Sequence, residues 1–308
     1  MTEIQYSETV AHNVRSRVVV VTGGAQGIGA ATVTLLHGLG AHVVFGDISE
    51  SAGEKLEKSL SNPPESNPSS GTAHFVKTNV CSYADQLALF EAAFHRHGRV
   101  DAAITCAGIL DDPDLFDPSK LTLDAVREES SVITNALNTN LLSAVHFSRL
   151  ALAYITASPA LLGDFTPSLT FTSSITGIFW ASSMACYSTS KHGLVGLSRT
   201  LSQNPSPIRS NAICPSATNT SIVSDALREM WTGQLGLSMQ EPSDVAKYIV
   251  QCVADSTLNG KTVVVARGEA RDVDEVLEGS VERWMGEENA REWRLLKGLA
   301  VSSLPDDG

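Results

Sequence analysis

The stretch RVVVVTGGAQGIG, residues 17–29, decides the fold of this chain of 308 residues. Its start, Arg17–Val21, is a continuous apolar run of the kind found in buried strands of parallel sheets, and the residues after Gly29 repeat with helical periodicity. Gly23 and Gly27, with Gly29, permit a tight strand-to-helix turn and a close approach of the backbone to a pyrophosphate. The spacing is Gly-x-x-x-Gly-x-Gly. The alternative interpretation is a glycine-rich turn that holds no ligand.

A second strand is predicted at His42–Gly46, and it ends in Asp47. The carboxylate lies eighteen residues beyond Gly29, close to the roughly 20 expected for a group that accepts hydrogen bonds from an adenosine ribose diol. A carboxylate there repels a 2′-phosphate, and Ile48, Ser49 and Glu50 add no basic group. The pattern therefore favours NAD over NADP. The alternative is a turn aspartate that caps the next helix, a role that Ser49 could take instead.

The pair Tyr187 and Lys191 stands four residues apart, and Ser174 stands thirteen residues before the tyrosine. One helical turn places the lysine ammonium on the same face as the phenol. A positive charge there favours the phenolate and is expected to lower the tyrosine pKa from about 10 toward the working range. With a serine hydroxyl nearby, these groups suit proton transfer at an alcohol or ketone oxygen. Alone, such a pair is weak evidence, since most are ordinary surface residues of helices.

Strands alternate with helices along the chain, which predicts an α/β fold with a Rossmann-type, doubly wound parallel sheet in a single domain. Further strands are expected at Ala73–Lys77, Ala102–Thr105, Leu169–Thr172, Asn211–Cys214 and Thr262–Val265, and long helices at Asp85–His97, Leu121–Tyr154, Met184–Ser202 and Ser243–Ala254. We predict an N-terminal extension (1–14), a nucleotide-binding domain (15–270) with an integral substrate lid (about 217–240), and a helical C-terminal extension (271–308).

Composition narrows the class of protein. The net charge of −12 disfavours nucleic acid and anionic membrane surfaces as partners. Residues 1–13 lack the basic start and apolar centre of a signal peptide, and no apolar run is long enough to cross a membrane, so a cytoplasmic location is expected. The cysteines show no paired spacing and no metal motif, which suits a reducing compartment and predicts no metal site; they are Cys81, Cys106, Cys186, Cys214 and Cys252.

Taken together, these motifs make the chain similar to the short-chain dehydrogenase/reductase family over roughly residues 15–268. The general look of the chain resembles the hydroxyprostaglandin dehydrogenase-like branch. The resemblance rests on Thr22 to Gly29, Asp47, Asn79, Val80, Cys106, Ala107, Gly108, Asn140, Ser174, Tyr187, Lys191 and Pro215 to Thr220.

The resemblance implies a role for each matched residue. Tyr187 would be the general acid/base, and Ser174 would position the substrate and stabilise its oxygen. Lys191 would lower the tyrosine pKa and hold the nicotinamide ribose, and Asn140 would anchor a water in a proton relay. The cofactor would be NAD, bound by Thr22, Gly23, Gln26, Gly27, Ile28, Gly29, Asp47, Ile48, Asn79, Val80, Cys106, Ala107, Gly108, Tyr187, Lys191, Pro215, Ser216, Thr218 and Thr220.

Three positions depart from the family pattern. Asn79 stands where an aspartate usually contacts adenine, and Cys106 replaces the second asparagine of the usual Asn-Asn-Ala-Gly strand end. Ser216 replaces a glycine beside the nicotinamide and needs compatible backbone angles. Ser173 competes with Ser174 for the serine role, and we prefer Ser174 because its spacing to the tyrosine matches the family motif.

The substrate is expected to be small and hydrophobic. Two segments frame the predicted pocket, Ile109–Lys120 and Ala217–Gln240, and Phe179 and Trp180 add an apolar wall. Arg228 is the only arginine in these walls, which disfavours an anionic substrate. We expect a steroid-, terpenoid-, polyketide- or fatty-alcohol-like secondary alcohol or its ketone. The alternatives are an NADP-dependent ketoreductase and a non-redox cyclase or isomerase that keeps bound cofactor. The family resemblance also implies a homodimer or homotetramer.

Overall fold

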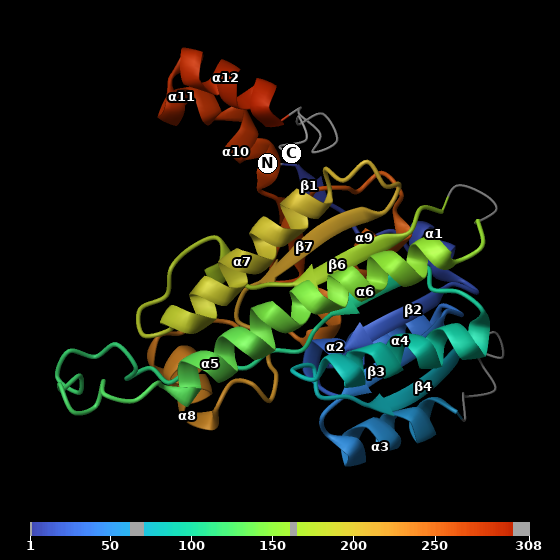
Figure 1. Cartoon of the computed structure of the whole chain (residues 1–308), viewed down its shortest axis with the longest axis horizontal. Coiled ribbons are helices and arrows are strands. Elements are labelled where there is room, and N and C mark those ends of the chain that lie inside the picture. The colour runs from blue at the N-terminus through green and yellow to red at the C-terminus, as the bar shows by residue number, and fades with distance from the viewer. Residues whose placement is uncertain (1, 62–70, 161–164, 298–308) are drawn as a thin grey trace, which may run out of the picture.

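A computed structural model describes residues 2–61, 71–160 and 165–297. Its centre is one nine-stranded sheet with the order β1-β9-β8-β7-β6-β5-β2-β3-β4 (Figure 1). The strands are β1 Glu3–Ile4, β2 Val18–Thr22, β3 His42–Asp47, β4 Thr72–Lys77, β5 Ala102–Thr105, β6 Ser168–Thr172, β7 Arg209–Pro215, β8 Thr262–Ala266 and β9 Glu269–Asp272.

Helices cover both faces of the sheet, and a set of short C-terminal helices stands apart from these layers (Figure 1). The α-helices are α1 Glu8–Ala11, α2 Gly27–Gly38, α3 Glu50–Leu60, α4 Tyr83–His97, α5 Ser131–Leu137, α6 Ser143–Ala157, α7 Ala185–Leu201, α8 Asp225–Glu229, α9 Pro242–Ala254, α10 Asp274–Gly279, α11 Val281–Met285 and α12 Glu287–Lys297. Short 3₁₀ turns lie at His12–Val14 and Ile175–Gly177, and π-helical turns at Asn138–Leu142 and Met230–Gln234.

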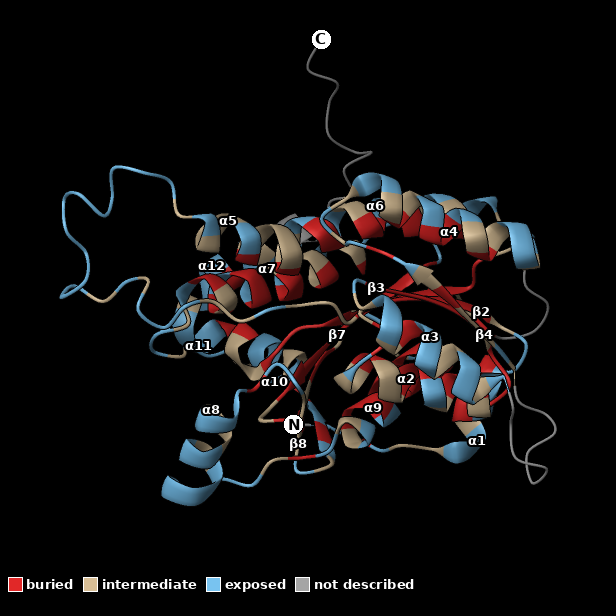
Figure 2. Ribbon diagram, turned by 90° about the horizontal axis from the view of Figure 1, so that it is seen from below, coloured by how far each residue is buried: buried red, intermediate tan, exposed pale blue. Residues whose placement is uncertain are grey.

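The valine run of the opening motif forms the middle of the core. Every residue of β2 is buried. Successive side chains of a strand face opposite sides of the sheet, and helices cover both sides here. Val19 and Val21 pack in the cluster that includes α2 and α9, whereas Val18 and Val20 pack in the cluster that includes α4 and α6. Figure 2 shows the buried sheet between its two helix layers. A strand covered on both faces has to be apolar along its whole length, as this one is.

The order of the strands creates the position of the site. From β2 the chain adds β3 and β4 on one side and β5, β6, β7 and β8 on the other, so the order reverses between β2 and β5. In open parallel sheets, ligands bind outside the carboxyl ends of the strands at such a reversal. The glycine loop follows β2 and the segment from Cys106 follows β5, which places both at this point.

The predicted elements are confirmed within about two residues, with one exception. The single helix expected at Leu121–Tyr154 is wrong: residues 121–130 contain no helix, and α5 begins only at Ser131. Leu121, Leu123 and Val126 are exposed, so they have no core surface to pack against. Helical periodicity in the sequence therefore did not produce a helix where no tertiary contact covered its apolar face.

The two ends of the chain also differ in detail from the expected extensions. β1 pairs with β9 in antiparallel orientation, so the N-terminal segment belongs to the sheet, and β9 itself is antiparallel to β8. The helical tail is divided at Ser280 and at Gly286, whose φ of 81° is left-handed, into α10, α11 and α12. Residues 298–308 of the expected extension lie outside the described part of the chain.

Arg209 ties the far end of the sheet together. The residue is buried at the start of β7, and its guanidinium donates hydrogen bonds to the carbonyl oxygens of Thr166, Cys252, Val253 and Leu258 and to the hydroxyl of Thr166, all at 2.7 to 3.0 Å. Burial lowers the pKa of Arg209 to about 10. The side chain thereby satisfies the last carbonyls of α9, which have no partner within their own helix.

Arg209→Leu is expected to lower the free energy of unfolding by roughly 3 kcal/mol or more, because several buried acceptors lose their donor and each costs about 1–3 kcal/mol. Urea unfolding followed by circular dichroism measures the change. Arg271→Leu, at a half-exposed arginine of β9, is the control and is expected to change stability by less than about 0.5 kcal/mol. Equal effects of the two substitutions would contradict this role.

Candidate active site

The glycine loop has the shape that a bound pyrophosphate requires. Gly23 has a left-handed φ of 65°, and a Cβ there would lie 2.5 Å from the backbone nitrogen of Ala107. A Cβ on Gly29 would overlap the carbonyl oxygen of Gly23. Gly27 also has a left-handed φ, of 51°, and begins α2. The loop is therefore packed so closely that backbone N–H groups, and not side chains, face the ligand position at the N-terminus of this helix.

Asp47 lies at the end of β3 and supports the glycine loop. One of its carboxylate oxygens accepts a hydrogen bond from the backbone nitrogen of Ala25 at 3.0 Å, and the other accepts one from Ser49, also at 3.0 Å. The residue is buried, with 9% of its surface exposed. Each carboxylate oxygen has a second lone pair, so these contacts leave capacity for a ribose hydroxyl. Asp47 thus connects the glycine loop to the turn before α3, and its role toward a ribose stays a prediction.

The structure accommodates the three residues that depart from the family pattern. Asn79 is exposed, and its side-chain oxygen accepts from the backbone nitrogen of Cys81 at 3.0 Å. Cys106 lies 3.3 Å from the hydroxyl of Thr172, and burial raises the pKa of its thiol to about 11. Ser216 does not have a positive φ, so its backbone angles suit a serine.

The start of the lid lies against the glycine loop. A Cβ on Gly27 would lie 3.1 Å from the methyl group of Thr220. The hydroxyl of Ser221 donates to the side-chain oxygen of Gln26 at 3.2 Å. Thr218 binds the carbonyl of Ser216 with its hydroxyl at 2.8 Å. Residues that are almost 200 positions apart in the sequence therefore enclose the position expected for the cofactor phosphates.

The predicted catalytic residues converge beside this cradle. Tyr187 and Lys191 lie on one face of α7, with the lysine Nζ 5.4 Å from the centroid of the tyrosine ring. Ser174 follows β6, is buried, and lies close enough to Tyr187 for its hydroxyl to lower the pKa of the phenol. Ser173, the alternative candidate for the serine role, instead donates to the carbonyl of Lys191 at 2.8 Å. The structure therefore brings Ser174, and not Ser173, to the phenol.

Burial controls the protonation of this cluster. It raises the pKa of Tyr187, an effect that the hydrogen bond from Ser174 opposes and that the charges of Asp111 and Cys214 reinforce. Burial also lowers the pKa of Lys191 to about 8. The expected lowering of the tyrosine pKa by the lysine is thus wrong in direction for this structure, because removal of the phenol from water disfavours the phenolate more than nearby groups favour it.

Asn140 connects the cluster to the strand end. It is buried in the π-helical turn between α5 and α6, and its amide donates to the carbonyl of Ile109 at 2.9 Å and to Ser190 at 3.1 Å. Ser190 in turn donates to the carbonyl of Tyr187 at 2.7 Å. A Cβ on Gly108 would lie 3.3 Å from Asn140 Oδ1 and 3.4 Å from the Nζ of Lys191. The four residues predicted to be catalytic therefore lie together at one place.

The lid and the segment after β5 stand on the same side of the molecule (Figures 1 and 2). Both carry exposed apolar side chains, and the largest exposure nearby is that of Trp180, at 86%. Arg228 folds back onto the lid, where its guanidinium binds Asn219 and the carbonyls of Thr220 and Val223. The exposed surface of these two segments therefore includes apolar side chains, together with acidic ones such as Asp112 and Asp114.

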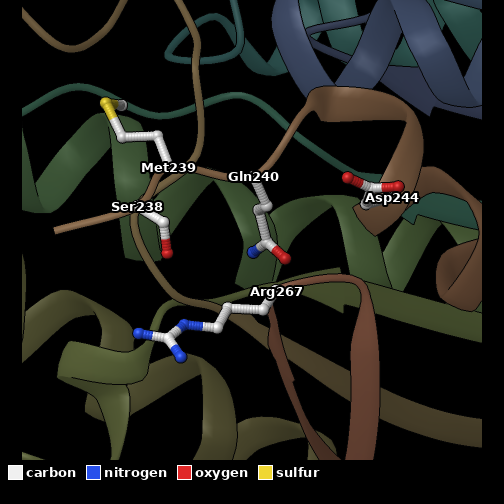
Figure 3. A pocket seen from close by; sticks show the side chains of 5 residues that line it. All are labelled: Ser238, Met239, Gln240, Asp244 and Arg267. Atoms are coloured by element: carbon white, nitrogen blue, oxygen red, sulfur yellow. The ribbon is translucent and has the colours of Figure 1, made fainter. Parts of the chain in front are cut away.

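A hollow of about 520 Å³ lies where the lid returns to the body, lined by Ser238, Met239, Gln240, Asp244 and Arg267 (Figure 3). Gln240 spans it and donates to the carbonyl of Val265 at 2.9 Å, while its oxygen accepts from the nitrogen of Gly268 at 3.3 Å. The guanidinium of Arg267 points away from the carboxylate of Asp244 (Figure 3). Gln240 therefore anchors the end of the lid to the turn between β8 and β9.

Sequence reasoning missed Ser190, Gln240 and Asp111. Each acts through a contact with a residue distant in the chain, and no motif spacing marks it.

Among the described residues, no group of three or more His, Cys, Asp or Glu side chains has the geometry to hold a metal ion, and no helix is long and apolar enough to span a membrane.

The fold and the site define a class: α/β proteins with a dinucleotide cradle and a Ser–Tyr–Lys cluster at the carboxyl edge of a parallel sheet. The sequence pattern of the family described as short chain dehydrogenase matches residues 17–231. The chain belongs to the short-chain dehydrogenase/reductase family, whose members are oxidoreductases that use a nicotinamide cofactor.

Relatives and solved structures agree with this assignment. A short-chain dehydrogenase/reductase of Acremonium egyptiacum, ascJ, is 32% identical over 89% of this chain and 86% of its own. (+)-Borneol dehydrogenase 1 of Salvia officinalis is 29% identical over 85% of this chain and 96% of its own. The crystal structure of 3-hydroxyacyl-CoA dehydrogenase type-2 from Mycobacterium avium superposes with a TM-score of 0.67 at 25% identity, covering 81% of this chain and 94% of that one.

Proposed function

We propose that the protein is an NAD-dependent oxidoreductase that interconverts a hydrophobic secondary alcohol and its ketone. The observation that carries the proposal is the position of Lys191 and Ser174 beside the phenol of Tyr187, next to a closely packed glycine loop at the N-terminus of α2. A phenol, a hydroxyl and an ammonium at one point are the groups that proton transfer at an alcohol oxygen needs.

In this proposal Tyr187 exchanges a proton with the substrate oxygen. As the phenolate it removes the hydroxyl proton of the alcohol, and as the phenol it protonates the oxygen of the ketone. Ser174 donates a hydrogen bond to that oxygen and orients it. The Nζ of Lys191, held by the carbonyl of Thr172 at 2.9 Å, brings a positive charge beside the phenol when it is protonated. A bound nicotinamide supplies or accepts the hydride.

The character of the surrounding surface supports a hydrophobic substrate. The lid and the segment after β5 present apolar side chains, and the one arginine of the lid is bound to backbone carbonyls of its own segment. The relative named (+)-borneol dehydrogenase 1 is also named for an alcohol. A homodimer or homotetramer and a cytoplasmic location stay predictions.

The cofactor preference is tested at Asp47. NADH is expected to bind more tightly than NADPH, because the carboxylate repels a 2′-phosphate. Asp47→Asn removes the charge but keeps an acceptor for the nitrogen of Ala25, so it changes the choice of cofactor with little disturbance of the glycine loop. The expected result is a fall of roughly tenfold or more in the ratio of NADPH to NADH dissociation constants, measured by cofactor fluorescence.

Glu50→Gln is the matched control, because Glu50 follows Asp47 closely but is paired with Lys77 at the surface. Its ratio is expected to stay unchanged. Tighter NADPH binding by the unaltered protein would favour the NADP-dependent ketoreductase. NADH binding without turnover of any alcohol or ketone would favour a non-redox role.

A further inference from the structure

Asp111 reaches from the segment after β5 to the helix that carries the catalytic tyrosine. One carboxylate oxygen, Oδ2, accepts a hydrogen bond from the backbone nitrogen of Cys186 at 2.7 Å, across 75 positions of sequence. Cys186 lies in the first turn of α7, and the residue before the helix, Met184, makes no side-chain capping bond. The first turn of the catalytic helix is therefore capped by a carboxylate from another part of the chain.

The second carboxylate oxygen of Asp111, Oδ1, is buried and has no hydrogen-bond partner among the described residues. Burying a carboxylate oxygen without a hydrogen-bond donor lowers the stability of the folded protein. Cys186, whose nitrogen is capped, directly precedes Tyr187, and the negative charge of Asp111 raises the pKa of that phenol.

The groups around the phenol come from four elements. Lys191 lies one turn along α7, Ser174 follows β6, Cys214 lies on β7, and Asp111 comes from the segment after β5. The thiol of Cys186 is next to Tyr187 in the chain, and burial raises the pKa of that thiol, so it is neutral near pH 7. Asp111 is thus the carboxylate among these groups.

We propose that Asp111 is a positioning residue for the reaction: its carboxylate fixes the first turn of α7 and holds a negative charge against the phenol of Tyr187. The consequence is that the tyrosine keeps its proton to a higher pH. The protein is thereby set to donate a proton to a ketone near neutral pH, and alcohol oxidation gains rate as the pH rises. The kinetic part of this inference rests on the proposed function.

Asp111→Asn removes the negative charge but keeps the helix cap, because the amide oxygen still accepts a hydrogen bond from the backbone nitrogen of Cys186. The rising limb of kcat/KM against pH for alcohol oxidation is expected to move to lower pH by roughly one unit. Asp112→Asn, at the exposed neighbouring carboxylate, is the control and leaves the limb in place. An identical limb in Asp111→Asn and in the unaltered protein would overturn the proposal.

A second measurement does not need a substrate. The tyrosinate absorbance of the unaltered protein minus that of Tyr187→Phe reports the titration of the Tyr187 phenol alone. The same subtraction is made between Asp111→Asn and the double variant Asp111→Asn/Tyr187→Phe. A titration shifted to lower pH supports the role of Asp111 even if no alcohol is turned over, in which case only the proposed function fails. An unshifted titration overturns the role. Should Asp111→Asn not fold, Asp111→Ser removes the charge, keeps an oxygen for the cap and carries the same test.

Discussion

Tyr187→Phe is expected to lower kcat for the alcohol or ketone by about a thousandfold, within the range of roughly 10²–10⁴ that a general acid/base contributes. The substitution removes one oxygen from a ring that keeps its place on α7, because the buried contacts of the neighbouring Cys186 and Lys191 are unchanged. NADH affinity is expected to change by less than about threefold, since most of the cradle is made by the glycine loop. Steady-state kinetics and cofactor fluorescence measure the two quantities.

Tyr154→Phe is the matched control for this loss. Tyr154 packs on Phe90 and Phe94 in the layer of α4 and α6, away from the catalytic cluster, and the chemical change is the same. Its kcat is expected to equal that of the unaltered protein. Substantial activity in Tyr187→Phe would remove the tyrosine from the mechanism and make a non-redox or water-mediated reaction the better explanation.

Gly29→Ala is expected to weaken NADH binding by more than about tenfold and to lower the free energy of unfolding by about 1–3 kcal/mol. The added methyl group would overlap the carbonyl oxygen of Gly23 and approach the Cα of Gly24 to 3.1 Å. Backbone atoms are in the way, so the loop itself has to move, and its N–H groups then leave the positions that the pyrophosphate needs. Fluorescence titration and urea unfolding give the two values.

Gly38→Ala provides the comparison within the same helix. Nothing lies within 4 Å of the position of its Cβ, so the substitution is expected to leave NADH binding unchanged and to stabilise the helix by roughly 0.5–1 kcal/mol. If the two alanine substitutions weakened cofactor binding equally, close packing of the loop would not be the reason for Gly29.

Local sequence signals determined most of the fold. The valines of β2, the glycines that follow it and the alternation of strands and helices predicted a doubly wound sheet, and the strand order confirms it. These signals are readable because a buried parallel strand must be apolar throughout and a turn with left-handed residues favours glycine. The failure at residues 121–130 has the complementary reason: an apolar periodicity forms a helix only where another surface covers it.

The sequence by itself also indicated which residues meet at the candidate site: the spacing pointed to Ser174, Tyr187 and Lys191, and the family resemblance added Asn140. Only the tertiary structure decided how these groups behave. It assigned the hydroxyl of Ser174 to the phenol, it placed Asp111 on the first turn of α7, and it made burial raise the pKa of Tyr187. Hydrogen-bond partners and loss of solvent depend on packing between segments that are far apart in the chain, and no local pattern records that packing.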